Sequence, residues 1–207
     1  MTPPLLAEPS LADPFEESTV QRAVSSAADV LFTRDGVTPT TLEAVADRAD
    51  VPLDVLTDAY PTKQALLVAV LRRWHGGWQG ALDRIATEAD GPVDEVLAVF
   101  SYLEECFADD DWRGCAFING HAELGRQDPL VAVLVREHFS TIRAHLVAVC
   151  ARAGIPAHVA GALTLLVEGA RVDSAVQRSA EPARTARLGA AMLMSVYTTS
   201  DEATTAH

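Results

Sequence analysis

Apolar residues recur every three or four positions along most of this 207-residue chain, a spacing that aligns them on one face of an α-helix. The first such stripe runs from Val20 to Phe32 and stops at Asp35-Gly36, where glycine favours the end of a helix. We therefore expect an amphipathic helix over this segment, with its apolar face turned towards a core.

Two short stripes and the start of a long one follow. Leu42 to Ala49 predicts a short helix, and Thr41 is placed to cap its first turn through the hydroxyl. Asp50-Val51-Pro52 breaks the pattern, Val55 to Pro61 forms a second short helix, and a third stripe opens at Leu66. Two short helices joined by a tight turn and backed by the first helix predict a helix-turn-helix, whose second helix enters the DNA major groove.

The remaining two thirds of the chain also read as helices. The long helix that opens at Leu66 contains Gly76 and Gly77, which either bend it or make room for a packed neighbour. Further helices are expected over 93–107, 112–124, 131–149, 159–176 and 183–197. The sequence therefore predicts an all-α fold.

Two stretches resemble a known family. AADVLFTRDGVTPTTLEAVADRADVPLDVLTDAYPTKQAL, which ends in an aromatic residue, proline and lysine at Tyr60-Pro61-Thr62-Lys63, resembles the amino-terminal domain of the tetracycline-repressor (TetR) family. RGCAFINGHAELGRQDPLVAVLVREHF, from Arg113 to Phe139, resembles a carboxy-terminal domain of the same family. The resemblance covers nearly the whole chain. It implies an amino-terminal three-helix helix-turn-helix domain followed by a helical ligand-binding and dimerisation domain.

The predicted domains follow from this resemblance and from composition. Residues 1–17 contain four prolines among small and acidic residues and predict a flexible arm. This arm carries no Lys or Arg, so a minor-groove role is not expected. The DNA-binding-like domain spans 18–63, the ligand-binding and dimerisation domain spans 64–200, and 201–207 is a polar tail.

The DNA-facing part departs from the family pattern. Asp50 stands where the family has glycine, Asp54 lies at the start of the second short helix, and Thr57 and Ala59 replace Tyr and His. From residue 16 to residue 73 the chain carries nine acids and six bases, a net charge of −3, which opposes the phosphate attraction behind most DNA affinity. The side chains that remain for DNA are threonines and one lysine. They are Thr40, Thr41 and Lys63, expected at phosphates, and Thr57, expected at a base edge or a phosphate.

Composition limits the partners and the location. The formal net charge of −13 disfavours membrane surfaces and bulk nucleic-acid binding, so DNA contact should be local and specific. Three cysteines without metal-ligand spacing indicate reduced thiols. We see neither a signal peptide nor a membrane segment and expect a cytoplasmic protein.

The last two predicted helices, 159–176 and 183–197, are rich in Gly and Ala, which let helices approach closely. Their apolar surface favours a two-fold four-helix bundle built from two subunits, as the resemblance also implies. The alternative is an antiparallel pair buried within one subunit. We therefore expect a homodimer.

Strong catalytic and cofactor motifs do not occur, so no cofactor or catalytic residue is expected. The acidic run 109–111 is read as a solvated helix end, and no metal site is predicted. Aromatic and polar residues on the later helices could instead line a small-molecule site, or the aromatic ones could simply be core. They are Trp78, Phe100, Phe107, Phe117, Asn119, His121, Phe139, Arg143, Glu168 and Arg171.

Two functions fit these patterns. The first is a ligand-responsive TetR-like transcriptional regulator, a repressor by type, in which an apolar small-molecule effector acts on binding to a palindromic DNA operator. The alternative is a TetR-like fold that has lost DNA binding and serves as a small-molecule-binding protein or an enzyme. The enzyme hypothesis would use His121 with Glu168, but His121 and its neighbour Glu123 point to different sides of a helix.

Overall fold

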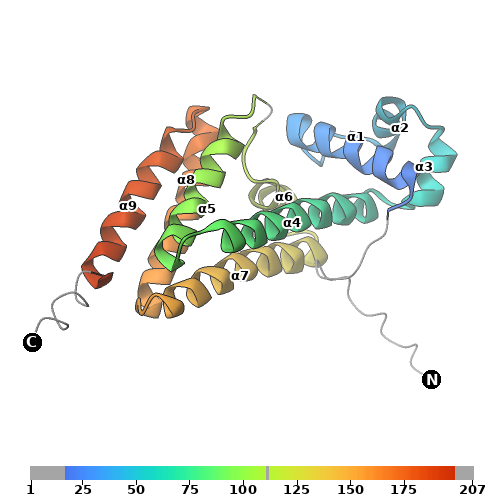
Figure 1. Ribbon diagram of the computed structural model, residues 1–207. Helices are drawn as coiled ribbons and strands as arrows, with labels where there is room; N and C mark the ends of the chain where they lie inside the picture. The colour runs from blue at the N-terminus through green and yellow to red at the C-terminus, as the bar shows by residue number, and fades with distance from the viewer. Residues whose placement is uncertain (1–16, 111, 199–207) are drawn as a thin grey trace, which may run out of the picture. The chain divides into compact units, whose positions relative to one another are not determined.

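The computed structural model describes residues 17–110 and 112–198, and within them it contains helices and no strand. The helices are α1 (Thr19–Asp35), α2 (Leu42–Ala49), α3 (Leu53–Ala59), α4 (Lys63–Glu88), α5 (Pro92–Phe107), α6 (Ala116–Leu124), α7 (Pro129–Arg152), α8 (Ala157–Gln177) and α9 (Glu181–Thr198) (Figure 1). The predicted all-α fold is confirmed. Most of the predicted arm, the tail and Asp111 of the acidic run lie outside the described residues.

The ends of the first two helices follow their local sequence. Ser18 Oγ accepts from the Gln21 amide at 3.2 Å while the Ser18 amide donates back to Gln21 Oε1 at 3.0 Å, a reciprocal cap of α1. Gly36 ends this helix at φ +91°, a conformation that glycine adopts without strain. Thr41 Oγ1 accepts from the Ala44 amide at 3.2 Å, which confirms the predicted cap of α2.

Helix α4 runs without interruption through Gly76 and Gly77. A Cβ atom added at either position would meet no atom of the described residues within 4 Å. The interpretation that these glycines make room for a packed neighbour is therefore wrong. What they contribute is low helix propensity, about 1 kcal/mol each relative to alanine.

The chain divides into two compact units. The first unit holds residues up to Gly77 together with 116–138, and the second holds 78–115 and the residues from Phe139 onwards. These units do not coincide with the predicted domains 18–63 and 64–200, which stay a prediction. The reason lies partly in α4, whose first turns bury Leu66, Leu67 and Leu71 in the core.

In the first unit, α1 packs across both α2 and α3. Its fully buried Val24 and Ala28 share this core with Val45 of α2 and Leu56 of α3. Helices α2 and α3 form the predicted helix-turn-helix, and α1 lies behind them. The third helix is needed because two helices of eight and seven residues are too short to bury an apolar face alone.

In the second unit, α9 lies beside both α5 and α8 (Figure 1). The shared core contains Phe100 and Leu103 of α5, Val167 of α8 and Ala190 of α9. Small residues allow the close approach of these helices, as predicted. None of the helices in the part of the chain that the structure describes is both long and apolar enough to cross a membrane.

Candidate functional site

The turn between α2 and α3 sets the exposure of α3. Asp50 ends α2 in the left-handed region at φ 54°, which asparagine and aspartate enter more readily than other side chains. The following α3 has Pro52 at its amino-terminal cap and no side-chain cap. Leu53 and Val55 of this helix are exposed apolar residues, so α3 presents a free outer face.

The loop between α1 and α2 is held by two opposite charges. The Lys63 ammonium donates to the carbonyl oxygens of Val37, Thr38 and Thr40 at 3.0, 2.9 and 3.0 Å. From α6, Glu123 accepts from the amides of Val37 and Thr38 at 3.1 and 2.8 Å. We call this arrangement the loop clamp. It uses all three ammonium hydrogens of Lys63 on main-chain groups.

The predicted DNA-contact residues therefore fall into two kinds. Thr40 is buried and donates to the Gly36 carbonyl at 2.7 Å, and Lys63 belongs to the loop clamp. Thr41 is exposed and caps α2, and Thr57 is partly exposed and donates to the Asp54 carbonyl at 3.0 Å. All four residues therefore have a structural role. The sequence predicted this role for Thr41 but not for Thr40, Thr57 and Lys63. Their phosphate or base contacts stay a prediction.

The outer face of α3 is acidic. Asp54 and Asp58 are exposed, and no Lys or Arg occurs between Val51 and Thr62. The Asp54 carboxylate accepts from the Val55 amide at 2.9 Å, a local bond at a helix start. The Asp54 carboxylate keeps its negative charge in this bond, so it still repels an anionic partner such as DNA.

The ten predicted ligand residues do not all lie in one unit. Phe117, Asn119 and His121 are in the first unit, where Phe117 is buried and the other two are exposed. The other seven are in the second unit. Among these seven, Phe100, Phe107 and Arg171 are buried, Trp78, Phe139 and Glu168 are half-buried, and Arg143 is exposed.

Three of the predicted ligand residues meet at a buried cation. The Arg171 guanidinium, 1% exposed, lies 4.2 Å from the centre of the Trp78 ring. Its Nη1 donates to Glu168 Oε1 at 3.3 Å and lies 3.9 Å from Cys115 Sγ. Its Nη2 is buried and has no hydrogen-bond partner among the residues that the structure describes. Burial raises the pKa of Glu168, and the Arg171 charge opposes this shift.

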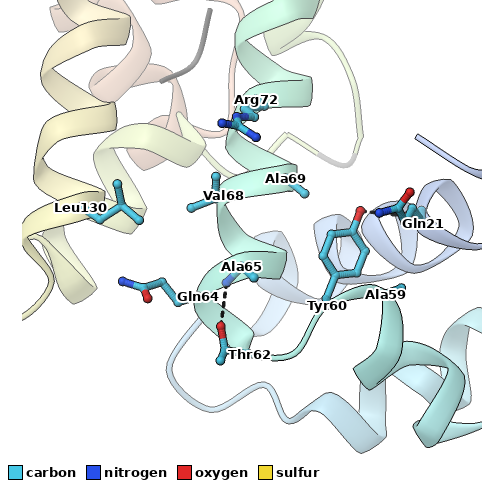
Figure 2. Close-up of a pocket in the computed structure, with 10 residues that line it drawn as sticks. All are labelled: Gln21, Ala59, Tyr60, Thr62, Gln64, Ala65, Val68, Ala69, Arg72 and Leu130. Atoms are coloured by element: carbon cyan, nitrogen blue, oxygen red, sulfur yellow. Dashed lines mark hydrogen bonds between the residues drawn. The ribbon is translucent and has the colours of Figure 1, made fainter. Parts of the chain in front are cut away.

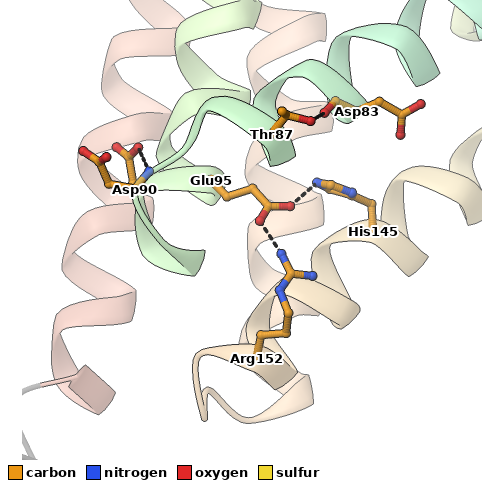
Figure 3. A network of polar contacts seen from close by, with 7 residues as sticks. Asp83, Thr87, Asp90, Glu95, His145 and Arg152 are labelled. Atoms are coloured by element: carbon orange, nitrogen blue, oxygen red, sulfur yellow. Dashed lines mark hydrogen bonds and ion pairs between the residues drawn. The ribbon is translucent and has the colours of Figure 1, made fainter.

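A second buried charge lies at the start of α5. Glu95 is buried and forms an ion pair with Arg152, and His145 Nε2 lies 3.4 Å from its other carboxylate oxygen; both partners come from α7 (Figure 3). Burial lowers the pKa of His145, while the neighbouring Glu95 carboxylate acts in the opposite direction. This network joins two helices of the second unit by side chains alone.

The first unit contains a buried histidine pair. His75 Nδ1 and His138 Nδ1 are 3.0 Å apart, so one of them carries the shared hydrogen and the other accepts it. The predicted ligand residue Phe117 stacks on His138 with ring centres 3.7 Å apart. Burial lowers the pKa of His75. Phe117 is thus part of the packing around this pair.

Sequence reasoning missed Glu123 as a loop anchor and His75, Glu95 and His138 as buried polar residues. Each of the last three falls on the apolar stripe of its helix, and a polar residue on such a stripe is the one local signal that could have found them. Glu123 carries no such signal because its partners are main-chain amides 85 and 86 residues away.

The enzyme hypothesis gains no geometric support. His121 is exposed and its ring lies close to Gly125, while Glu123 is engaged in the loop clamp. Within the described residues, no group of three His, Cys, Asp or Glu side chains could hold a metal ion.

Comparison with known proteins supports the same architecture. No family model matches the chain. It is 35% identical over 91 residues to the HTH-type transcriptional regulator YjdC of Escherichia coli K12, and the same match is found to YjdC of Shigella flexneri. The aligned part covers 42% of this chain and about half, 47%, of the length of these curated relatives.

Solved structures extend the likeness to most of the chain. A TetR-family transcriptional regulator from Streptomyces coelicolor is 18% identical, with a TM-score of 0.81 over 86% of this chain and 96% of that one. Reduced NemR of Escherichia coli is 19% identical, with a TM-score of 0.73 over 84% and 96%. The chain has the TetR-family fold. With this TetR-family fold in place, α2 and α3 are its helix-turn-helix.

Proposed function

We propose that this protein is a homodimeric, ligand-responsive transcriptional regulator of the TetR type, which acts as a repressor in the cytoplasm. The observation that carries the proposal is the exposed α2–α3 pair, built as a helix-turn-helix within a TetR-family fold. Homologous matches to regulators support it further.

On DNA, α3 would enter the major groove of a palindromic operator. Thr57 would reach a base edge or a phosphate, and Thr41 would hold a phosphate beside it. Thr40 and Lys63 would hold the same phosphate indirectly, by fixing the conformation of the loop between α1 and α2. Because α3 is acidic, affinity would depend on these few contacts and on dimerisation rather than on general attraction to phosphates.

Dimerisation is supported by an apolar face that α8 and α9 expose. Leu165 is 71% exposed, Met192 72% and Val176 77%, values unusual for large apolar residues clustered on two adjacent helices. The face also includes Val172, Leu188, Leu193 and Val196. Contiguous exposed apolar surface of this kind marks an interaction site. Pairing with its copy gives a four-helix bundle with two-fold symmetry.

An effector would bind in the second unit, beside Arg171. The buried Nη2 without a partner and the aromatic face of Trp78 are suited to an apolar molecule with one hydrogen-bond acceptor. Phe100, Phe107, Phe139 and Glu168 complete the apolar and polar set from this unit. The effector changes operator affinity only if it binds two states of the protein unequally.

The test of DNA binding is fluorescence anisotropy with labelled DNA from upstream of the gene, at low salt, against a scrambled duplex. Thr57→Val removes the hydroxyl at constant shape, and Thr87→Val is the matched control on an exposed part of α4. We expect specific binding that Thr57→Val weakens and Thr87→Val leaves unchanged. Binding of both duplexes alike would contradict the operator proposal.

The dimer and the effector need separate tests. Light scattering should give a dimer at micromolar concentration, and Leu165→Glu with Met192→Glu should give a folded monomer. A monomeric unmodified protein would reject the dimer. A thermal-shift screen of apolar compounds should find a stabilising one, and Arg171→Met should abolish its effect.

A second candidate function is a TetR-like small-molecule-binding protein without DNA binding. The observation that favours it is the acidic α3, on which Asp54 and Asp58 are exposed. Tight binding of a small molecule together with no retention of any duplex at micromolar protein would select this candidate over the regulator.

A further inference from the structure

The inner side of α3 is fixed by two residues in the core of the first unit. Leu56 is fully buried, and Tyr60, the carboxy-terminal cap of α3, is buried as well. Figure 2 shows the Tyr60 hydroxyl pointing at Gln21 of α1, whose carbonyl accepts from it at 3.4 Å. These contacts set the rotation of α3 about its own axis, so they decide which of its side chains face away from the protein.

Asp54 and Asp58 form the centre of the outer face of α3. Each is two positions from Leu56, and at about 3.6 residues per turn both lie about 160° round the helix from that buried side chain. Both are exposed. The Asp54 carboxylate accepts from the Val55 amide, whereas Asp58 takes part in no hydrogen bond or ion pair among the residues that the structure describes. The Asp58 carboxylate is therefore available to a partner.

Apolar and hydroxyl side chains flank the two carboxylates. Leu53 and Thr57, four positions apart, share one edge of the outer face, and Val55 lies on the other edge; Leu53 and Val55 are exposed. The Thr57 hydroxyl donates to the Asp54 carbonyl at 3.0 Å, so its oxygen remains as an acceptor. Residues 53–59 include no Lys, Arg, Asn, Gln or His. The outer face of α3 thus offers hydrogen-bond acceptors and methyl groups.

The bases of DNA differ in what they present to such a face in the major groove. Guanine presents the acceptors N7 and O6, cytosine presents its N4 amino donor, and thymine carries a methyl group. A carboxylate accepts from the cytosine amino group and is repelled by the guanine acceptors, so it discriminates between these bases in both directions. Arginine and lysine, the usual partners of guanine, are absent from α3.

We propose that α3 reads a cytosine and a thymine in each operator half-site: Asp58 accepts from the cytosine N4 amino group, and Leu53 lies against the thymine methyl group. The two residues are about 7.5 Å apart along the helix axis, which is about two base steps. This inference rests on the proposed regulator function and adds the base chemistry that its operator presents.

The negative charge of α3 gains a purpose in this arrangement. Repulsion between carboxylates and phosphates lowers the affinity for every sequence alike. A hydrogen bond to one base restores affinity only for the duplex that carries this base at the right position. An acidic recognition helix therefore binds more weakly and selects more strictly than a basic one.

The experiment begins with the full chain at low salt and a pool of duplexes randomised over a palindrome. We expect the enriched half-site to contain cytosine and thymine one or two base pairs apart. The selected duplex is then remade with deoxyuridine, which removes only the thymine methyl group, or with N4-methylcytosine, which replaces the amino hydrogen in the major groove. Fluorescence anisotropy should show about threefold weaker binding of the first and about tenfold weaker binding of the second.

Variants test the two assigned side chains. Asp58→Asn adds a donor and should move the preferred base from cytosine towards adenine, which asparagine recognises through N6 and N7. Asp47→Asn, at an exposed acid of α2, is the matched control and should leave the preferred base unchanged. Leu53→Ala should bind the thymine and deoxyuridine duplexes equally. Val30→Ala, at an exposed valine of α1, should keep their difference.

Two outcomes would overturn the proposal, and they differ in what else they reject. If a duplex is selected and its deoxyuridine and N4-methylcytosine forms bind as well as the parent, the assigned base contacts are wrong and the regulator stands. If micromolar protein enriches no sequence from the pool, the regulator is rejected and this inference with it.

Discussion

Two charged clusters, one in each unit of the chain, are built in opposite ways. In the first unit, Lys63 and Glu123 act on main-chain groups of a partly exposed loop. In the second unit, Glu95 and Arg171 are buried and pair with other side chains. Water can replace a lost partner in the first case and not in the second. Losing a charge should therefore loosen a loop in one unit and destabilise the core of the other.

The largest effect is expected at Arg171. Arg171→Ala leaves Glu168 without its cation and a cavity beside Trp78, and we expect a loss of about 3 kcal/mol in the free energy of unfolding, measured with urea. The double variant Arg171→Met with Glu168→Gln keeps the volume and removes both charges, so its stability should stay near that of the unmodified protein. Equal losses in the two cases would show that the contacts of the Arg171 guanidinium with Glu168 and Trp78 stabilise the fold, rather than that an unpaired charge or a cavity destabilises the variant.

A smaller effect is expected from the loop clamp. Glu123→Ala removes the acceptor of two main-chain amides and should cost about 1–2 kcal/mol, mainly as local opening. Hydrogen exchange should speed up at Val37 and Thr38, and operator affinity should fall. Glu105→Ala, an exposed acid on α5, is the control. An unchanged exchange rate at both amides would contradict the clamp.

Lowering the pH should reduce the stability of both units, because each contains a histidine whose burial opposes its protonation. Burial lowers the pKa of His75 and of His145 below the ordinary 6.5, with Glu137 acting against the shift in His75 and Glu95 and Asp83 against that in His145. Between 6.5 and the lowered values the unfolded chain binds more protons. Stability is therefore complete above pH 6.5 and is lost as the pH falls through this window.

Single variants assign this loss to its source. His75→Phe or His145→Phe should reduce the pH dependence of urea unfolding, and replacing the exposed His158 should not. Glu168 acts in the other direction, because burial raises its pKa above 4.5 and the folded state then binds more protons. Its effect lies between pH 4.5 and the raised pKa. A steeper acid loss after either His→Phe exchange would refute the assignment.

The smallest effect concerns the acidic face of α3. Asp54→Asn removes one exposed negative charge near the DNA and should raise the affinity for any duplex about twofold to threefold, with a steeper salt dependence. Anisotropy titrations at several salt concentrations measure both quantities. Asp94→Asn on α5 is the matched control. No change after Asp54→Asn would mean that α3 does not approach DNA.

Local chemistry explains why the helices could be predicted. The stripe from Val20 to Phe32, the cap at Thr41 and the stop at Gly36 depend on residues within a few positions of each other, and all three are found as expected. The candidate site was predicted less completely. Trp78, Glu168 and Arg171 were selected and do meet, whereas Phe117, Asn119 and His121 lie in the other unit.

By itself, the sequence determined the helix order, the helix-turn-helix and the acidic character of α3, because periodicity, caps and charge counts are local properties. Only the tertiary structure decided which distant groups meet. Glu123 reaches a loop 85 and 86 residues away, and Arg171 lies 56 residues from Cys115. Such pairings follow from how helices pack, and packing depends on the whole set of apolar faces at once, which no short stretch of sequence contains.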